Sequence, residues 1–413
     1  MATAPVNEIP VGEIDLGDMT LWEEGPPHEI FDRLRAQAPV HWSPMATWEN
    51  EPGFWSITRP EDIHEISRDW ETFSSERGGI LIADNSAPIE VQNSMFIGMD
   101  PPRHDRIKAI FQRGFTPKRI GEHEVAIRAI ATEKFDLIDG REEAELVADI
   151  AQPVVARVIG SFLGSPPEDD EHWADLALRG LAVGNEELQP GGDNLATVER
   201  VLTDAMALAA ERRENPTDDL TSLLVHTEVD GEQLSDLEVA AGFALLVAAG
   251  MDSTKATYSN GMVALLKNPG ERQKLVDDPS LIPGAVEEFL RMHPAFLNFR
   301  RTATRDVELH GQTIREGDKV IMWYPASNRD EREYECPHQL DVERNPDHQA
   351  FGAGGRHFCL GTALARLELK ILFEETLRRY PQMELTSTPE PLPSLFTNQV
   401  KAIPVKLGPR ADR

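Results

Sequence analysis

Cys359 has the clearest chemical setting in this chain, because it lies in a glycine-rich stretch that runs from Phe351 to Gly361. Apolar residues recur after it at helical spacing and predict a helix that ends near Tyr380-Pro381. The N-terminus of a helix stabilises a thiolate through its dipole and its unpaired N–H groups. The chain has only two cysteines, so this placement indicates a thiolate presented to a metal rather than a disulfide.

Three other interpretations of this stretch are open on the residues alone. A lone cysteine is most often a small buried hydrophobic residue. Glycines before a helix can bind phosphate, but no Lys-Ser/Thr follows these glycines and the pattern G-x-G-x-x-G is not completed. A zinc site needs four ligands, and only His357 and Cys359 stand together here. The whole string is far more specific than any of its parts.

A second candidate site lies in the middle of a long apolar segment. Ser235 to Glu238 form a capping box, and the helix that they begin is predicted to reach Lys267, about 30 residues and therefore roughly 45 Å. Gly250 weakens this helix midway, and the Ser253 hydroxyl can bond back to a carbonyl one turn earlier. Such a bend between small residues makes a groove for a small ligand. The alternative is close packing against a neighbouring helix, with Asp252 facing water.

The string from Phe351 to Glu368, F-G-A-G-G-R-H-F-C-L-G-x-x-L-A-R-L-E, resembles the haem-binding loop of the cytochrome P-450 monooxygenases in their soluble bacterial form. The resemblance implies that Cys359 is the axial thiolate of haem (heme b, iron protoporphyrin IX), which favours O–O cleavage. Phe351 lies one residue further from the cysteine than the family pattern usually has it, a feature of a branch that oxidises steroids and branched lipids. The implied fold is mainly α with small β-sheets, a single large haem domain over 16–413 after a tail at 1–15.

The middle of the long helix also matches this family, which carries an Ala/Gly-Gly-x-Asp/Glu-Thr segment over the haem. By this resemblance Asp252 relays protons and Ser253 hydrogen-bonds the oxygen that is being activated, which is general acid work. Serine stands here where the family usually has threonine, and it lacks the methyl group that restricts the rotamer. We therefore expect oxygen activation to survive with more peroxide leak.

The two propionates of a haem call for cations or hydrogen-bond donors. Lys108 stands where the family usually has arginine, so it lacks the planar guanidinium and its role is open. A solvated surface cation is the alternative for each of these positions. The residues that match family positions for haem binding are His357, Arg301, His104 and Lys108.

A third group of residues is implied to be structural. Glu288 and Arg291 are three residues apart, so they share one face of a predicted helix. On spacing alone they are most simply a surface ion pair. The family resemblance implies that they join Arg344 in an ion cluster that supports folding and haem retention.

Composition restricts the function and the setting of the protein. The chain has 413 residues, with 41 basic against 71 acidic side chains and a net charge of −30, which argues against nucleic-acid binding. No uninterrupted run of 18 apolar residues and no signal segment appear, so we expect a cytoplasmic protein. Cys336 is expected to be a free thiol. No second domain for flavin or nicotinamide fits in the chain, so electrons must come from separate proteins.

One short region is basic in this acidic chain. Only Asp105 opposes its cations, so the region is expected to attract an acidic iron–sulfur ferredoxin at the face that carries Cys359. A helix with a solvated basic side is the alternative. The basic residues are Arg103, Arg106, Lys108, Arg113, Lys118 and Arg119.

The expected substrate pocket is apolar and lies above the haem. Residues 113–117 and 398–401 resemble the branch that oxidises steroids and branched lipids. The sequence thus predicts a monooxygenase that hydroxylates a sterol, a terpenoid or a branched lipid with O2 and electrons from a ferredoxin and its reductase. The alternatives are a peroxide-driven haem oxygenase and a non-catalytic haem- or lipid-binding protein. Expected pocket walls are the 79–98 loop and Leu245, Ala248, Phe296, Leu297 and Phe396.

Overall fold

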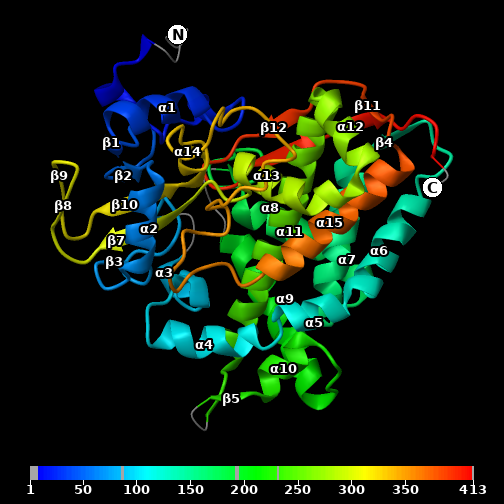
Figure 1. Ribbon diagram of the computed structural model, residues 1–413. Helices are drawn as coiled ribbons and strands as arrows, with labels where there is room; N and C mark the ends of the chain where they lie inside the picture. The colour runs from blue at the N-terminus through cyan, green and yellow to red at the C-terminus, as the bar shows by residue number, and fades with distance from the viewer. Residues whose placement is uncertain (1–7, 85–87, 191–194, 230–231, 412–413) are drawn as a thin grey trace.

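The computed structural model describes residues 8–84, 88–190, 195–229 and 232–411. Over these ranges the protein is mainly α-helical with small β-sheets, which confirms the predicted fold class (Figure 1). Residues 1–7 of the predicted tail lie outside the described residues. The later part of that predicted tail contains a short 3-10 helix, η2 (Val11–Glu13), and Ile14 is buried in a hydrophobic cluster. These residues therefore pack against the rest of the protein.

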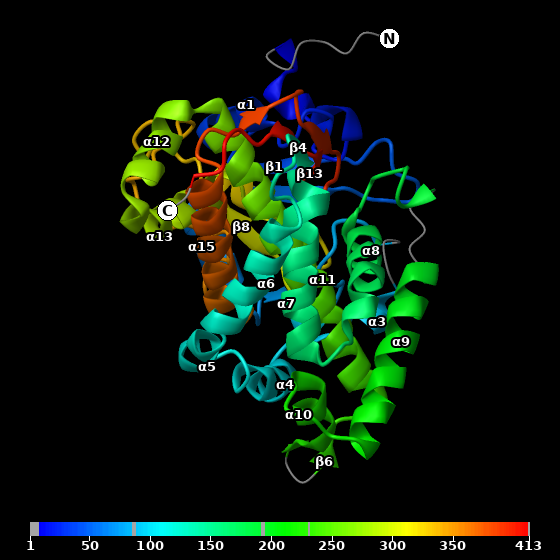
Figure 2. The ribbon, with the colours of Figure 1, turned by 90° about the vertical axis from the view of Figure 1, so that its right-hand side faces the viewer.

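The helices gather around one long helix, α11 (Asp236–Lys267), which contacts α7, α8, α9 and α15 (Figures 1 and 2). The other longer helices are α1 (His28–Gln37), α4 (Arg103–Gln112), α6 (Glu124–Asp136), α7 (Gln152–Leu163), α8 (Asp170–Leu181), α9 (Leu195–Glu214), α13 (Ile282–Met292) and α15 (Thr362–Arg379). The shorter ones are α2 (Pro60–Arg68), α3 (Ile89–Gln92), α5 (Pro117–Glu122), α10 (Leu220–His226), α12 (Pro269–Asp277) and α14 (Tyr324–Ser327). One-turn segments include η3 (Met19–Trp22), η4 (Phe96–Gly98), η5 (Val147–Ala151), η6 (Pro167–Asp169) and η8 (Pro279–Leu281).

The ends of α11 follow from the sequence. Ser235 Oγ accepts a hydrogen bond from the Glu238 N–H, and the Glu238 carboxylate accepts one from the Ser235 N–H at 3.0 Å, so the predicted capping box forms. The helix ends at Lys267, as predicted. By length and composition α11 could cross a membrane, but 56% of its most apolar window is buried inside the protein. This is the pattern of a core helix, and α11 forms the back wall of the site described below.

A five-stranded sheet lies beside this helical part, with the strand order β1-β2-β10-β7-β3 (Figure 1). Strand β10 runs parallel to β2 and antiparallel to β7, and Ile321 pairs with Arg300. Successive side chains of β7 point to opposite faces of the sheet. Phe299 and Arg301 therefore lie on one face, and Arg300 lies on the opposite face. The strands are β1 (Val40–Ser43), β2 (Phe54–Ile57), β3 (Phe73–Ser74), β7 (Asn298–Ala303) and β10 (Lys319–Trp323).

The remaining strands form two- and three-stranded sheets at the periphery. The largest hydrophobic cluster surrounds α11, and a second one joins the N-terminal segment to the sheet through Trp22, Phe31 and Trp323. The peripheral strands are β4 (Glu143–Glu145), β5 (Glu228–Val229), β6 (Glu232–Gln233), β8 (Val307–Leu309), β9 (Gln312–Ile314), β11 (Glu384–Leu385), β12 (Glu390–Leu392), β13 (Gln399–Ala402) and β14 (Pro404–Lys406).

Candidate active site

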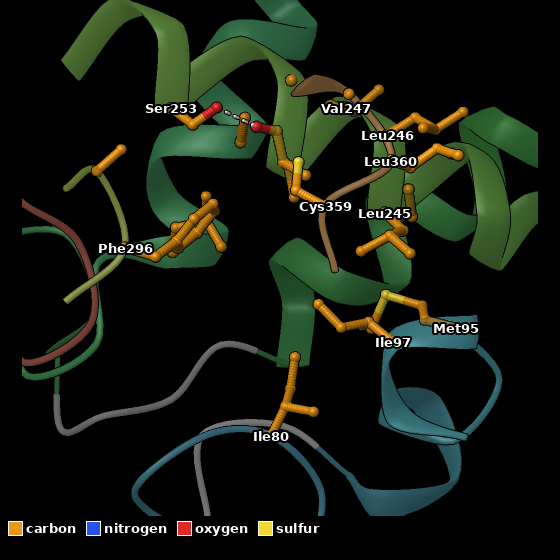
Figure 3. Close-up of a pocket in the computed structure, with 18 of the residues that line it drawn as sticks. Ile80, Met95, Ile97, Leu245, Leu246, Val247, Ser253, Phe296, Cys359 and Leu360 are labelled. Atoms are coloured by element: carbon orange, nitrogen blue, oxygen red, sulfur yellow. Dashed lines mark hydrogen bonds between the residues drawn. The ribbon is translucent and has the colours of Figure 1, made fainter. Parts of the chain in front are cut away.

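An apolar cavity of about 290 Å³ lies between α11 and the stretch that carries Cys359 (Figure 3). Its walls come from α8, α9, α11, α15, β7 and residues 80–97. Most of the side chains that line it are aliphatic or aromatic, which suits a hydrophobic small molecule. The charged and imidazole side chains that reach it are His104, Lys108, Arg301, His357 and Glu368.

Cys359 lies at the floor of this cavity, just before α15 (Figure 3). Its N–H donates to the Phe351 carbonyl at 3.0 Å, which closes the loop. Gly355 has a φ of +77°, and a Cβ there would lie 2.4 Å from the Ser67 carbonyl oxygen, so only glycine allows the loop to pack on α2. Cys359 is solvent-accessible, and it lines both the cavity and a second groove that it shares with Lys108 and Phe358. Burial raises the pKa of this thiol, while the Gly361 N–H and the Lys108 charge oppose that rise.

Arg301, His104 and His357 bring three nitrogen-bearing groups to the same cavity. The rings of His104 and His357 are 4.4 Å apart, and burial lowers the pKa of both imidazoles and of Arg301. Among the described residues, His104 Nε2 and His357 Nδ1 are buried without a hydrogen-bond partner. Unpartnered buried polar atoms are costly, so they indicate a missing polar ligand. The residues present therefore fit the two propionates of a haem held on Cys359.

Lys108, whose role the sequence left open, lines the cavity and bonds the backbone of the cysteine loop. Its side chain is buried, and its ammonium donates to the carbonyl of Arg356 and, at 2.7 Å, to the carbonyl of Phe358. The ammonium is thus engaged by the backbone of the cysteine loop and is not left free for a propionate. A flexible lysine can reach both carbonyls from α4, which a planar guanidinium would do less readily.

The predicted acid–hydroxyl pair on α11 points in two directions. Ser253 lines the cavity, and its hydroxyl donates to the Ala249 carbonyl at 2.6 Å, as the sequence predicted (Figure 3). Asp252 is 2% exposed and is not among the lining residues. Its two carboxyl oxygens accept from Lys255 Nζ at 2.6 Å and from Gln399 Nε2 at 2.9 Å. In this structure Ser253 alone of the pair reaches the cavity.

Glu368 is a buried acid. It is the last residue of the motif that resembles the haem-binding loop, and no role was predicted for it. It lines the cavity at 1% exposure, and its Oε2 accepts from the Thr254 hydroxyl at 3.1 Å. Burial raises the pKa of Glu368 to about 8, so the carboxyl group is mainly protonated at neutral pH. Leu364 and Leu372 lie one helical turn away on either side of Glu368, on the apolar face of α15. This spacing could have predicted that Glu368 is buried.

The implied ion cluster forms as expected. Arg291 donates to both oxygens of Glu288, at 2.7 and 2.8 Å, and Arg344 Nε approaches Glu288 Oε1 to 3.2 Å. Glu288 and Arg291 are fully buried. A further Arg291 nitrogen donates to the carbonyls of Asn328 and Pro337, so the cluster joins α13 to the segment that precedes the cysteine loop.

Four of the five expected pocket walls, Leu245, Ala248, Phe296 and Phe396, line the cavity. Leu297 does not, which corrects the prediction. The extended backbone turns its side chain to the opposite side from Phe296, and Leu297 is 1% exposed in the second hydrophobic cluster. Lining residues that were not predicted singly include Ile80, Leu81, Met95, Ile97, Ile159, Leu246 and Val247.

The basic region has fewer available cations than its sequence suggests. Lys108 is buried, Arg103 lies 3.5 Å from Glu238, and Asp105 pairs with Arg356. Phe358, next to Cys359, is 42% exposed, so this face combines an apolar side chain with cations. The exposed basic residues of the predicted cluster are Arg103, Arg106, Arg113, Lys118 and Arg119.

The helical fold, the thiol below an apolar cavity and the unpartnered imidazoles together define a haem-thiolate protein. A family model described as Cytochrome P450 matches residues 196–407. The methyl-branched lipid omega-hydroxylase of Mycobacterium tuberculosis (strain ATCC 25618 / H37Rv) is 36% identical, over 97% of this chain and 96% of its own. A steroid C26-monooxygenase of the same strain is 34% identical, over 96% of this chain and 98% of its own.

A solved Mycobacterium marinum cytochrome P450 in complex with pseudoionone superposes with a TM-score of 0.88, at 35% identity over 98% of this chain and 100% of that one. The chain therefore belongs to the cytochrome P450 family. It is a monooxygenase with haem b as cofactor, and its substrate is hydrophobic.

Proposed function

We propose that this cytochrome P450 hydroxylates an uncharged, branched or polycyclic molecule, such as a terpenoid, a sterol or a methyl-branched lipid, with electrons from a ferredoxin and its reductase. The apolar cavity above the Cys359 thiol is the observation that carries the proposal. The names of two relatives, which refer to methyl-branched lipids and steroids, and the pseudoionone bound by a structural neighbour support the same substrate class.

In this proposal Cys359 is the ligand of the haem iron, and Arg301, His104 and His357 bind the propionates. Bound there, haem supplies the activation of O2, and a thiolate ligand favours O–O cleavage. Lys108 keeps the cysteine loop in place by binding two of its carbonyls. The ion cluster around Glu288 ties α13 to the segment that precedes this loop and takes no part in the chemistry.

Proton supply is assigned to Ser253 and Asp252. The Ser253 hydroxyl lies in the cavity wall, where it can hold or donate a proton at Oγ. Asp252 is held outside the cavity by Lys255 and Gln399. The Asp252 side chain must therefore turn away from Lys255 before its carboxyl group can deliver a proton towards Ser253.

The charge distribution of the cavity supports an uncharged substrate. Among the described lining residues, the side chains that are charged, carboxylic or imidazole are His104, Lys108, Arg301, His357 and Glu368. The first four are assigned to the haem or its loop, and Glu368 is mainly protonated. The rest of the described lining carries no opposite charge to pair with a carboxylate or an ammonium, and burying an unpaired charge is very costly. The part of the substrate inside the cavity is therefore uncharged.

Electron delivery is assigned to the exposed face near Cys359. Arg106, Arg113, Lys118 and Arg119 are exposed there, and such cations attract an acidic partner over long distances. Iron–sulfur ferredoxins are acidic proteins, so they are the electron donors that we expect to bind this face. Phe358 adds an exposed apolar contact next to the haem ligand.

The test is turnover of a substrate panel by the haem-loaded enzyme with surrogate ferredoxin, reductase and NADPH. The panel contains pseudoionone, a sterol, and a methyl-branched fatty acid with its methyl ester. We expect ligand-induced spin-state shifts and hydroxylated products, and tighter binding of the ester than of the free acid. Absence of shift and product across the whole panel, or tighter binding of the free acid, would contradict the proposal.

One observation favours a second candidate, a peroxide-driven haem oxygenase. Asp252 is bonded away from the cavity, and an enzyme that uses peroxide does not need this acid to relay protons. Parallel turnover with hydrogen peroxide and with the ferredoxin pair distinguishes the two. Faster product formation with peroxide would favour the second candidate.

A further inference from the structure

The segment 79–84 forms part of the cavity wall but belongs to no helix or strand. Ile80 (Figure 3) and Leu81 line the cavity, and the next two residues, Ile82 and Ala83, are fully buried. An irregular segment has no ladder of backbone hydrogen bonds, so something else must fix its position. The role assigned to this wall rests on the proposed function, in which the wall contacts the substrate.

Two strands of the large sheet supply the missing partners. The backbone N–H of Arg300 donates to the Ile80 carbonyl at 3.0 Å, and its guanidinium donates to the Leu81 carbonyl at 3.4 Å. Lys319 Nζ donates to the Ile82 carbonyl at 3.3 Å. Three consecutive carbonyls of the wall are thus held by one residue of β7 and one residue of β10.

These two cations are themselves balanced by two carboxylates, Glu51 and Asp84. Lys319 Nζ contacts Glu51 Oε2 and lies 3.0 Å from Asp84 Oδ2, and Arg300 contacts Asp84 Oδ1. The Asp84 N–H donates to Glu51 Oε1 at 2.6 Å. We call Glu51, Asp84, Arg300 and Lys319 the wall network.

Asp84 is the only member of the wall network that reaches solvent. Its side chain is 55% exposed, whereas those of Glu51, Lys319 and Arg300 are between 3% and 5% exposed. Partial burial would raise the pKa of Asp84, but Arg300 and Lys319 outweigh this and lower it. Without Asp84, two buried cations would keep a single carboxylate between them, and the two side chains that hold the Leu81 and Ile82 carbonyls would be less firmly placed.

The wall network is connected directly to the haem site through β7. Phe299 and Arg301 line the cavity, while Arg300 between them faces the wall segment. The approach is close, because a Cβ at Gly78 would lie 2.2 Å from Arg300 Nη2. The strand that presents Arg301 to a propionate therefore also sets the place of Ile80 and Leu81.

We propose that Asp84 is a positioning residue for the substrate, which acts through Arg300 and Lys319 to hold the Ile80–Leu81 wall at a fixed place relative to Arg301. Substrates pressed against this wall present one part of their carbon skeleton to the haem. Because orientation at the reacting centre governs the reaction, a displaced wall would let a different part of the skeleton reach it. The wall network thus determines affinity and site of oxidation without touching the substrate.

The test compares the holoenzyme with its Asp84→Asn variant. We expect hydrogen exchange of peptides over residues 78–84 to rise about fivefold, with exchange elsewhere unchanged. The Kd and KM for pseudoionone should rise about five- to tenfold while kcat falls less than about twofold, and the ratio of hydroxylated products should change. Asp84→Glu, which keeps the charge, should restore most of the affinity.

The matched control is Glu61→Gln, which breaks an exposed ion pair with Arg332 that has no contact with the wall. It should change none of these quantities. Unchanged exchange over 78–84 in Asp84→Asn would overturn the tether, and faster exchange with unchanged Kd and product ratio would overturn the positioning role.

One further measurement and one comparison separate this proposal from related failures. If Asp84→Asn does not fold, the unaltered protein offers an independent measurement. About 1 M NaCl screens the exposed carboxylate and should speed hydrogen exchange over residues 78–84. Exchange that does not change with salt would overturn the proposal. Hydrogen exchange needs no substrate and no turnover. A protein that fails to hydroxylate the panel but shows the predicted exchange would contradict the proposed function alone.

Discussion

A substitution of Asp252 tests the proposed proton supply directly. Its carboxyl oxygens are bonded to Lys255 and Gln399, outside the cavity. If Asp252 supplies protons after leaving Lys255, Asp252→Asn should slow O2-driven turnover by roughly 100-fold and peroxide-driven turnover much less. Steady-state rates with the ferredoxin pair and with hydrogen peroxide check this. Gln399→Leu, which removes one of the two donors, is the control and should keep the O2-driven rate within a few-fold. Equal losses in both reactions of Asp252→Asn would argue against a relay.

Glu368 allows a prediction about stability and pH. Its folded-state pKa is raised to about 8 from a usual value of 4.5, because it is buried. Between these values the folded protein binds a proton that the unfolded chain has lost, so the free energy of unfolding decreases as the pH rises through this window. Glu368→Gln removes the titrating group, so it removes this pH-dependent decrease in the free energy of unfolding. Thermal unfolding should show Glu368→Gln gaining stability relative to the unaltered protein between pH 6 and pH 9. A difference in Tm that is independent of pH would contradict the assignment.

At the scale of elements, the buried ion cluster joins α13 to the segment before the cysteine loop. Removal of one partner leaves a buried charge without compensation, which costs about 3–5 kcal/mol. Glu288→Gln should therefore lower the free energy of unfolding by this order and reduce haem retention. Urea denaturation and the haem-to-protein ratio check the prediction. Glu343→Gln, in an exposed pair with Lys274, should cost less than about 1 kcal/mol. Similar losses in both variants would show that the cluster has no special role.

The sequence predicted the elements better than the directions of single side chains. The capping box and the proline stop are local signals, so α11 and the end of α15 were predicted correctly. The position of Asp252 depends on Lys255 and on Gln399, a residue distant in the chain, and no local pattern shows that pairing. Leu297 was wrongly predicted to line the cavity. Its neighbour Phe296 does line it, and successive side chains of an extended segment point to opposite sides. The bonds of Lys108 could not be predicted, because its partners are backbone carbonyls, which carry no sequence signal.

At the scale of the whole molecule, the charge distribution predicts how the electron donor binds. The chain has a net charge of −30, yet Arg113 and Lys118 are exposed, and their neighbours Gln112 and Pro117 line a groove together with Cys359. Replacing both by Glu should raise the KM for a surrogate ferredoxin about tenfold at low salt and weaken its salt dependence. Substrate Kd should not change. Lys406→Glu, on peripheral strand β14, is the control. An unchanged KM for ferredoxin in the double variant would place the docking surface elsewhere.

The central claim is that Cys359 holds a haem as its thiolate ligand beneath the apolar cavity. The most direct measurement is the absorption spectrum of the reduced, haem-loaded protein under carbon monoxide, compared with that of Cys359→Ser. The unaltered protein should show the red-shifted carbonyl band after which cytochromes P450 are named, and Cys359→Ser should lose it while keeping its far-ultraviolet circular dichroism. Absence of that band from the folded, haem-loaded protein, or its persistence in Cys359→Ser, would contradict the claim.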